Sequence, residues 1–286
     1  MSTPAASTNP RRCLLFVPGS RPERFEKAIA TGADQVCIDL EDAVGPADKV
    51  SARAAAFAFL AQARQTHSEV GLRLNPLGTA LGREDLAQLQ AADIAPAFVM
   101  LPKVETVEEL QAAEAALAGR ETALIAQIET PQGLLDARAL ANATPRLQAL
   151  MFGGFDFIVA LRGRACWESF FQPRAQLAMV AAAAGIGCID VPFLDFRDEA
   201  GLVSETDRVI ALGCTSKAAI HPAQVGPIQQ CFLPTASEFE RARCVIDALA
   251  ASGGAAVQLD GKLVDLPIEI AAGRTLALGA HGVRPD

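Results

Sequence analysis

The 286-residue sequence contains no tyrosine, one tryptophan and only three histidines, and these shortages narrow the chemistry available to it. Without tyrosine, no phenol can serve as a general acid. The histidines form no evident Ser-His-Asp or Cys-His arrangement with a nucleophile, so the sequence does not point to a serine or cysteine hydrolase.

The seven cysteines are odd in number and form no CxxC pair. A zinc or disulfide framework is therefore not expected, and buried free thiols in a reducing compartment explain them best. Residues 1–10 are small and polar with no apolar stretch behind them, so we expect no signal peptide. No apolar run is long enough to cross a bilayer. These features together predict a cytoplasmic protein.

The charge balance is acidic, with a formal net charge of −8 and a pI near 5.0. Such a surface disfavours nucleic acids and anionic membranes as partners. An anionic small molecule would need a local basic site. The length is enough for one large (β/α)-type domain with a sizeable core.

Eight short apolar runs alternate with alanine-rich helical stretches, which include residues 47–65, 106–118 and 199–212. The apolar runs are residues 13–18, 35–40, 70–75, 97–101, 123–128, 148–153, 186–191 and 216–220. Near-continuous hydrophobic strands separated by helices are typical of a parallel sheet covered on its outside. A doubly wound open sheet is the competing arrangement, but the even spacing and the count favour an α/β fold of the (β/α)8 TIM barrel type over residues 11–230.

The pattern changes after Pro222. Residues 235–251 are expected to form a helix, two short strands flank Asp260-Gly261 as a hairpin, and a last helix follows. Residues 231–286 are thus predicted to be a helix-hairpin-helix extension. We judge it too small for a core of its own, and expect it to pack across the barrel mouth or onto a neighbouring subunit.

Two carboxylates, Glu129 and Asp156, follow the fifth and sixth predicted strands. Neighbouring strand ends lie about 5 Å apart, so these side chains can face each other. Two carboxylates that close repel unless a cation neutralises them, and Mg²⁺ commonly takes one or two carboxylates together with water and substrate oxygens. The alternative is that one of them forms a structural ion pair with Arg73.

Arg73 stands inside an apolar strand, in Leu-Arg-Leu-Asn-Pro. Its planar fork suits a carboxylate or a developing enolate, and the alternative is a buried salt bridge to Asp39 or Glu41. Of the three clustered acids Asp39, Glu41 and Asp42, at least one should face the barrel mouth, and the others can cap the next helix. A supporting role, holding metal-bound water or Arg73, suits them better than direct ligation.

Two further polar residues follow predicted strands. Lys103 could in principle form a Schiff base with a carbonyl substrate, but Pro102 before it suggests a turn, and Val104-Glu105 after it suggest a helix start. His221, placed before Pro222, is more often structural than catalytic.

The strand ends together resemble the citrate lyase β-subunit-like family, which includes malyl-CoA lyases within the HpcH/HpaI aldolase superfamily. The resemblance runs from Arg12 to the C-terminal helix and rests on motifs in a fixed order. These are LFVPGSRPERFEKA, DLEDAVGPADK, LRLNPL, MLPKVE, IETPQG, FGGFD, DFRDEAGL, KAAIHPAQV and DGKLVDLP.

The resemblance implies a Mg²⁺-dependent TIM barrel that cleaves or forms a carbon–carbon bond in a hydroxyacyl-CoA thioester. It implies that Glu129 and Asp156 bind the metal and that Arg73 contacts the substrate's carboxylate or carbonyl. Two departures bear on the substrate. Phe155 precedes the metal aspartate, and Val191 stands where many relatives have glycine, which is expected to narrow the acyl pocket.

The resemblance also implies that Phe16, Arg21 and Lys27 hold the CoA portion. An acidic protein needs a local basic clamp for the CoA phosphates, and a helix start adds its own positive end. The alternative is a solvated helix face on which Glu23 and Lys27 form an i,i+4 pair.

The motif DGKLVDLP places Asp265 before a Pro-started helix. One interpretation is a helix N-cap. The other follows relatives whose tails cross between subunits in trimers, where Asp265 would act as acid/base at a neighbour's site. The chain is accordingly expected to be a homo-oligomer, a trimer or a hexamer.

The acyl group is left open among malyl, methylmalyl, citramalyl and citryl thioesters. Other functions stay open as well. The chain could be a citrate lyase β-type subunit that needs an acyl-carrier partner, or an acyl-CoA thioesterase or malate synthase-like enzyme on the same site. It could also be a pyruvate-forming aldolase that acts on free hydroxy acids.

Overall fold

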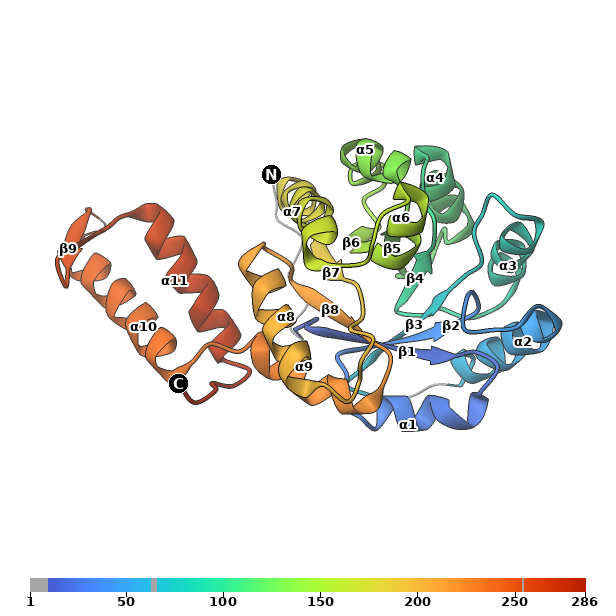
Figure 1. Cartoon of the computed structure of the whole chain (residues 1–286), viewed down its shortest axis with the longest axis horizontal. Coiled ribbons are helices and arrows are strands. Elements are labelled where there is room, and N and C mark those ends of the chain that lie inside the picture. The colour runs from blue at the N-terminus through green and yellow to red at the C-terminus, as the bar shows by residue number, and fades with distance from the viewer. Residues whose placement is uncertain (1–9, 63–65, 254) are drawn as a thin grey trace. The chain divides into compact units, whose positions relative to one another are not determined.

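The computed structural model describes residues 10–62, 66–253 and 255–286. The chain divides into two compact units, one formed by Arg11–Ile228 and the other mainly by Gln229–Asp286 (Figure 1). Two predicted features lie partly outside the described residues. They are the N-terminal residues 1–10, for which no signal peptide is expected, and the end of the helix predicted over residues 47–65. The packing of the C-terminal extension on the barrel mouth or on a neighbouring subunit stays a prediction, because the two units are described separately.

Eight parallel strands close into a barrel in chain order. They are β1 (Cys13–Pro18), β2 (Gln35–Asp39), β3 (Glu69–Arg73), β4 (Phe98–Leu101), β5 (Ala123–Ile128), β6 (Leu147–Phe152), β7 (Gly187–Asp190) and β8 (Ser216–Ala219). The first and last strands pair with each other, with Leu14 opposite Ala218. This closure confirms the predicted TIM barrel and excludes the open doubly wound sheet.

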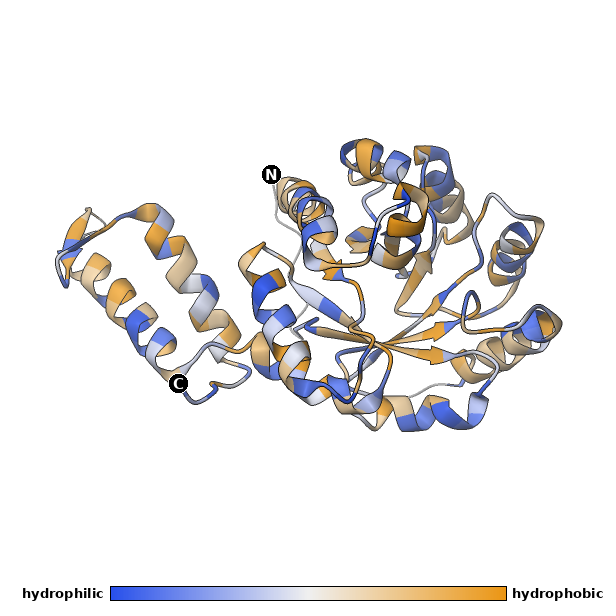
Figure 2. Cartoon of the chain, in the orientation of Figure 1, coloured by the Kyte–Doolittle hydropathy of each residue, from blue (hydrophilic) through white to orange (hydrophobic). Residues whose placement is uncertain are grey.

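Helices follow the strands around the barrel. They are α1 (Phe25–Ile29), α2 (Lys49–Leu60), α3 (Ala80–Ala91), α4 (Val107–Ala116), α5 (Pro131–Leu140), α6 (Gly154–Leu161), α7 (Trp167–Ala184), α8 (Glu199–Ala211) and α9 (Val225–Cys231). Local sequence fixes several starts: the hydroxyls of Thr79 and Thr130 accept from the backbone N–H three residues on. Figure 2 shows mostly hydrophobic residues along the barrel strands and mixed colouring on the helices, as amphipathic helices on a buried sheet require.

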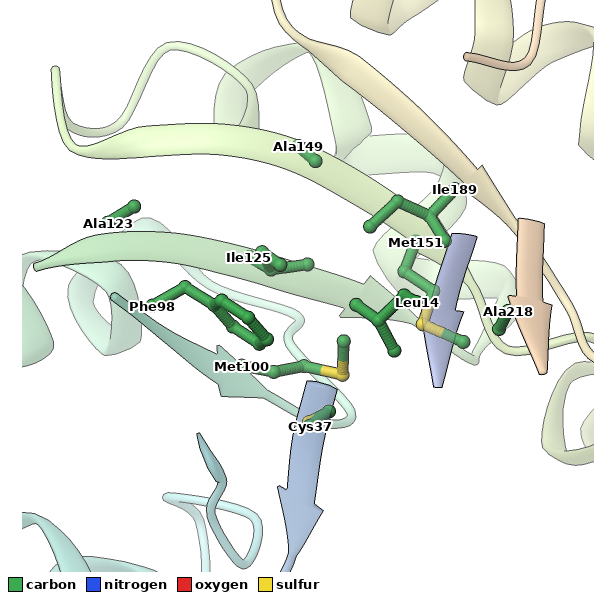
Figure 3. Close-up of a cluster of buried hydrophobic side chains, with 10 residues drawn as sticks. All are labelled: Leu14, Cys37, Phe98, Met100, Ala123, Ile125, Ala149, Met151, Ile189 and Ala218. Atoms are coloured by element: carbon green, nitrogen blue, oxygen red, sulfur yellow. The ribbon is translucent and has the colours of Figure 1, made fainter. Parts of the chain in front are cut away.

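The barrel interior is filled by side chains from seven of the eight strands (Figure 3). The cluster consists of Leu14, Cys37, Phe98, Met100, Ala123, Ile125, Ala149, Met151, Ile189 and Ala218. The third strand, β3, contributes no side chain to this cluster, and its Gly71 leaves room for a neighbouring one. A Cβ on Gly71 would lie 2.6 Å from two ring carbons of Phe98, so glycine lets that large ring enter the layer. The interior is therefore a packed core, and ligands are confined to its mouth.

A group of charges is buried between β7, β8 and the helices outside them. Lys217 Nζ donates to Asp190 Oδ2 at 2.6 Å, to Glu205 Oε1 at 2.8 Å and to the carbonyl of Val191 at 2.8 Å. Arg174 Nε donates to Asp190 Oδ1 at 2.7 Å. The side chains of Lys217 and Asp190 are fully buried, so each ion depends on the others for the stabilisation that water would have given.

The C-terminal unit contains α10 (Ala236–Ala251), β9 (Val257–Leu259), β10 (Lys262–Val264) and α11 (Leu266–Gly279). The predicted hairpin is confirmed: β9 and β10 pair antiparallel, and Asp260 and Gly261 both have positive φ, as a tight two-residue turn requires. The expectation of no core was wrong. Five buried residues form a small one, Ala242, Val245, Leu249, Val264 and Ala272, because the two helices pack face to face.

All seven cysteines are free thiols. The prediction that they are buried is confirmed for five and was wrong for Cys166 and Cys244, which are exposed. Within the described residues, no helix combines the length and apolar character that a membrane span requires.

Candidate active site

The carboxyl ends of the barrel strands surround a cavity of about 350 Å³. Its wall consists of Phe16, Asp39, Asp42, Ala43, Arg73, Gln127, Met151, Gly153, Phe155, Asp156, Val191, Pro192, Leu194 and Ile220. Every one of these residues belongs to, or follows, the carboxyl end of a strand. In barrels of this type the chemistry takes place at that face.

Glu129 directly follows β5, lies against Gly153 of the cavity wall and is 1% exposed. Neither of its carboxylate oxygens has a hydrogen-bond partner among the described residues. Burial, and then the charges of Glu41 and Asp156, raise the pKa of Glu129 to about 9. A buried carboxylate left without donors is unfavourable by itself, so this side chain is suited to receive a cation.

Asp156 comes from the first turn of α6, and its side chain is 46% exposed. Lys103 Nζ lies 3.6 Å from Asp156 Oδ1 and 3.9 Å from Glu129 Oε2. The two carboxylates predicted to face each other therefore meet at one ammonium group. The helix, and not the strand end itself, presents Asp156.

Arg73 is held by two carboxylates at the base of the cavity. Its Nε and Nη2 each donate to Asp39 at 2.7 Å, and its Nη1 lies 3.0 Å from Glu41 Oε2. Burial alone would raise the pKa of Asp39, but the charge and hydrogen bonds of Arg73 outweigh it and lower that pKa. The guanidinium carbon also lies 4.9 Å from the centre of the Phe16 ring. Arg73 thus makes the ion pairs that the sequence offered as its alternative role, while still lining the cavity.

Lys103 is the centre of the acidic cluster. Its Nζ donates to Glu41 Oε1 at 2.7 Å and lies within 4.0 Å of Asp42, Glu129 and Asp156. Burial would lower the pKa of Lys103, but the hydrogen bond and charge of Glu41 outweigh it and raise that pKa. An ammonium held charged in this way is a poor Schiff-base nucleophile.

The backbone explains how Lys103 reaches the cluster. Its φ is +53°, a left-handed conformation uncommon for residues other than glycine, and α4 begins only at Val107. Sequence reasoning missed this role, and it missed Gln127 in the cavity wall. A lysine directly after an apolar strand was the available signal for Lys103.

The donor set fits a magnesium ion. Glu129 and Asp156 supply hard carboxylate oxygens, and those of the buried Glu129 accept no hydrogen bond from the described residues. Within the described residues, no group of three or more histidine, cysteine or acidic side chains forms a complete metal cage. Mg²⁺ does not need one, because it is commonly held by one or two carboxylates with water and substrate oxygens filling its octahedron.

Gly153 makes room for Glu129. A Cβ at this position would lie 2.3 Å from Glu129 Cγ, although the backbone itself suits any residue. We expect Gly153→Ala to displace the carboxylate and weaken Mg²⁺ binding by about tenfold or more, measured by isothermal titration calorimetry. Gly226→Ala, where an added Cβ meets no atom within 4 Å, is the matched control. An unchanged Mg²⁺ affinity in Gly153→Ala would contradict the close packing.

The residues predicted to hold CoA are not all in this cavity. Phe16 lines it, whereas Arg21 lines a second cavity of about 480 Å³ between the β1–α1 connection and α2. Lys27 is exposed on α1. Glu23, its alternative partner, lies 4.0 Å from Arg24 instead.

Asp265 belongs to the C-terminal unit and occupies the N-cap position of α11. Its backbone oxygen accepts from Glu269 at 3.0 Å, but its side chain makes no capping hydrogen bond. The carboxylate is half-buried and is not used by the helix start.

A closed parallel barrel with carboxylates, Arg73 and Lys103 gathered at the carboxyl ends of its strands is the architecture of a TIM-barrel enzyme. The family model described as HpcH/HpaI aldolase/citrate lyase matches residues 12–222, and the chain belongs to this family. Its members are oxo-acid lyases, and this chain is a lyase of that type.

Similar proteins align with nearly the whole chain. The mitochondrial citramalyl-CoA lyase of Homo sapiens is 31% identical over 94% of this chain and 85% of its own length. The citrate lyase subunit beta of Leuconostoc mesenteroides subsp. cremoris is 30% identical over 94% of this chain and 93% of its own. The crystal structure of CitE from Mycobacterium tuberculosis, in complex with magnesium, acetoacetate and coenzyme A, superimposes with a TM-score of 0.83 at 31% identity, covering 96% of this chain and 100% of that chain.

Proposed function

We propose that the chain is a Mg²⁺-dependent carbon–carbon lyase that cleaves or forms a hydroxyacyl-CoA thioester such as malyl-, citramalyl- or citryl-CoA. The observation that carries this proposal is the buried carboxylate of Glu129, which accepts no hydrogen bond from the described residues and lies with Asp156 around Lys103 at the barrel mouth. The relative solved with magnesium and coenzyme A supports it.

The chain's own side chains supply positioning and electrostatics. Glu129 and Asp156 would hold the metal, which when bound would polarise substrate oxygens and offset negative charge that develops on them. Arg73, fixed by Asp39 and Glu41, presents a rigid positive edge to a substrate carboxylate or carbonyl. The packed hydrophobic cluster of the barrel interior excludes water from the inner side of the cavity.

The direct test follows acetyl-CoA release from the three thioesters by the purified chain. We expect turnover with Mg²⁺, loss of turnover with a chelator, and recovery when Mg²⁺ is restored. Activity that survives complete metal removal would overturn the proposed mechanism.

The same assay separates the alternative functions. The relative named citrate lyase subunit beta favours a second candidate, a subunit that acts only with an acyl-carrier partner. Turnover by the chain alone would exclude it. Release of free CoA without carbon–carbon cleavage would indicate a thioesterase, and condensation of acetyl-CoA with an oxo acid followed by CoA release would indicate malate synthase-like activity.

We also propose that Phe16, Arg21 and Lys27 bind the CoA portion. Arg21 precedes the short helix η1 (Pro22–Arg24) and lines the second cavity. Lys27 is exposed on the next helix, α1. Replacing both Arg21 and Lys27 with alanine removes two cations that would face phosphates. We expect the KM for the thioester to rise about tenfold or more with kcat little changed. An unchanged KM would mean that CoA binds elsewhere on the protein.

Asp265 is proposed to act as acid/base in the site of a neighbouring subunit of a homo-oligomer, a trimer or hexamer. Its side chain is free of capping bonds, and several large apolar residues around it are exposed, among them Leu263 (68%) and Leu266 (64%). Exposed apolar area of this kind is typical of an interface.

Subunit mixing tests the shared site. We expect Asp265→Asn to keep the fold, the oligomer and Mg²⁺ affinity while losing most activity. Mixed with Glu129→Ala chains, it should regain part of that activity, because hybrid oligomers contain some sites with both intact residues. A monomer in solution, or no recovery in well-mixed hybrids, would contradict the proposal.

A further inference from the structure

Part of the barrel-mouth cavity is lined by a segment that lies beyond the end of the sheet. The pairing of the neighbouring strands β7 and β8 ends with Asp190 opposite Lys217. Val191, Pro192 and Leu194 of the cavity wall all follow that point. Because the β7–β8 ladder does not reach these residues, other contacts must hold this part of the wall in place.

Gln224 supplies one of these contacts. It is the last residue of the short helix η3 (Pro222–Gln224), which follows β8, and it is 1% exposed. Its Oε1 accepts from the backbone N–H groups of Ile220 at 2.9 Å and His221 at 3.2 Å, and its Nε2 donates to the carbonyl of Phe193 at 2.7 Å. Two donors on one side and an acceptor on the other fix the orientation of the amide. The side chain thus joins the backbone after β7 to the backbone after β8.

The local turn explains only the bonds to Oε1. An acceptor three residues after the N-cap His221 completes a capping box, which is a common feature of helix starts. The bond from Nε2 leaves the turn and ends on Phe193, 31 residues away in the sequence. The ring of Phe193 lies against α8, since a Cβ on Gly201 would lie 2.9 Å from its Cζ. The residues on either side of Phe193, Pro192 and Leu194, line the cavity.

Two further contacts join the same segments. Lys217 Nζ donates to the carbonyl of Val191 at 2.8 Å. The rings of Phe196 and His221 stack with their centres 4.5 Å apart and their planes 19° from parallel. The segment after β7 is therefore held at three points by β8 and the turn that follows it, and Gln224 provides the contact next to the cavity wall.

We infer that Gln224 is a positioning residue of the active site, which fixes the part of the wall after β7 relative to Ile220 through its hydrogen bond to Phe193. The inference rests on the proposed function, because this wall would receive the thioester. Gln224 is not among the residues that line the cavity, so it acts through the backbone. A wall displaced by about 1 Å is enough to slow a reaction by about 100-fold.

Gln224→Glu tests the bond to Phe193 separately from the capping box. Glutamate serves as well as glutamine in a capping box, but its carboxylate cannot donate to a carbonyl. We expect kcat/KM for acetyl-CoA release at pH 8 to fall about tenfold or more. At pH 5 the buried carboxyl group should be protonated and able to donate again, so the ratio of variant to wild type should rise toward one. The matched control Gln90→Glu, exposed on α3, changes the charge equally and should give a ratio near one at both pH values.

Two measurements do not depend on turnover. Hydrogen–deuterium exchange at pH 8 should be about tenfold faster in residues 191–198 of Gln224→Glu than in the wild type, and unchanged in residues 123–140. Mg²⁺ affinity, from isothermal titration calorimetry, should also be unchanged, because Glu129 and Asp156 follow other strands. If the glutamate variant does not fold, Gln224→Asn takes its place. Its amide is too short to reach both partners, so it should show the slower turnover and the faster exchange at either pH.

The outcomes separate this inference from the proposed function. If the wild type releases no acetyl-CoA from any of the three thioesters in the presence of Mg²⁺, the lyase assignment fails, and the exchange measurement alone decides whether Gln224 holds the segment after β7. If the wild type is active, an unchanged kcat/KM in Gln224→Glu, or a ratio equally low at pH 5 and pH 8, overturns the inference and leaves the lyase assignment intact. Exchange in residues 191–198 that matches the wild type overturns it as well.

Discussion

Replacing Glu129 with glutamine should abolish turnover and at the same time stabilise the metal-free protein. The substitution removes a metal-binding oxygen and the negative charge, so we expect kcat/KM to fall at least about 100-fold. The stability gain has a separate cause, which is the raised pKa of the buried carboxyl group.

The sign of the stability effect follows from proton binding. Folded Glu129 keeps its proton up to a pKa of about 9, whereas in the unfolded chain it loses the proton near 4.5. Between these values the folded state binds more protons, so the metal-free wild type loses stability as pH rises through this window. By pH 7 the loss is on the order of 3 kcal/mol, and glutamine, which does not titrate, avoids it.

Thermal unfolding in the presence of a chelator, measured from pH 5 to 9, checks this prediction. The wild type should show a falling melting temperature that Glu129→Gln lacks, and added Mg²⁺ should raise the melting temperature of the wild type only. Parallel pH profiles for the two proteins would refute the account of Glu129 as a destabilised, cation-seeking carboxylate.

The second large effect is expected at Lys217, a buried lysine that lies behind the cavity-lining residue Val191 and does not itself line the cavity. Lys217→Met keeps a long apolar side chain but leaves Asp190 and Glu205 without their ammonium partner. Breaking a fully buried ion pair from one side typically costs about 3–5 kcal/mol. We therefore expect a marked fall in melting temperature and poor yield of soluble protein at 37 °C.

Controls separate charge from side-chain size at this position. Lys262→Met, on the exposed strand β10, should leave the melting temperature unchanged. Adding Asp190→Asn to Lys217→Met should recover part of the loss, because it restores the charge balance of the buried group, in which Arg174 still faces Glu205. A Lys217→Met protein as stable as the wild type would mean that the buried charges do not stabilise one another.

The barrel could be predicted from sequence because each strand is a short apolar run with a helix behind it. Closure needs no extra signal: eight such units bury every strand edge, as the β1–β8 pairing shows. The pairing of Glu129 with Asp156 could be inferred for the same reason, since neighbouring strands end at the same face. The small core of the C-terminal unit could not, because it arises only when α10 and α11 pack on each other.

Other parts of the site depend on backbone details that residue types do not encode. Lys103 combines a left-handed backbone conformation with a hydrogen bond to Glu41, whereas Pro102 before it indicated only a turn. The need for glycine at position 153 appears only once Glu129 lies against it. The ion pairs of Arg73 with both Asp39 and Glu41 likewise depend on side-chain geometry. From the sequence, a buried salt bridge to one of these acids was one of two possible roles for Arg73.

The distribution of exposed thiols makes the native chain ready for spectroscopic labelling. Of the seven cysteines, Cys166 is exposed in the barrel unit and Cys244 in the C-terminal unit, while the other five are buried. Maleimide dyes should therefore attach to one site on each unit without any engineered residue. Energy transfer between the two dyes would report the separation of the units, and its change on adding Mg²⁺ and CoA would measure directly whether the units move when the site fills.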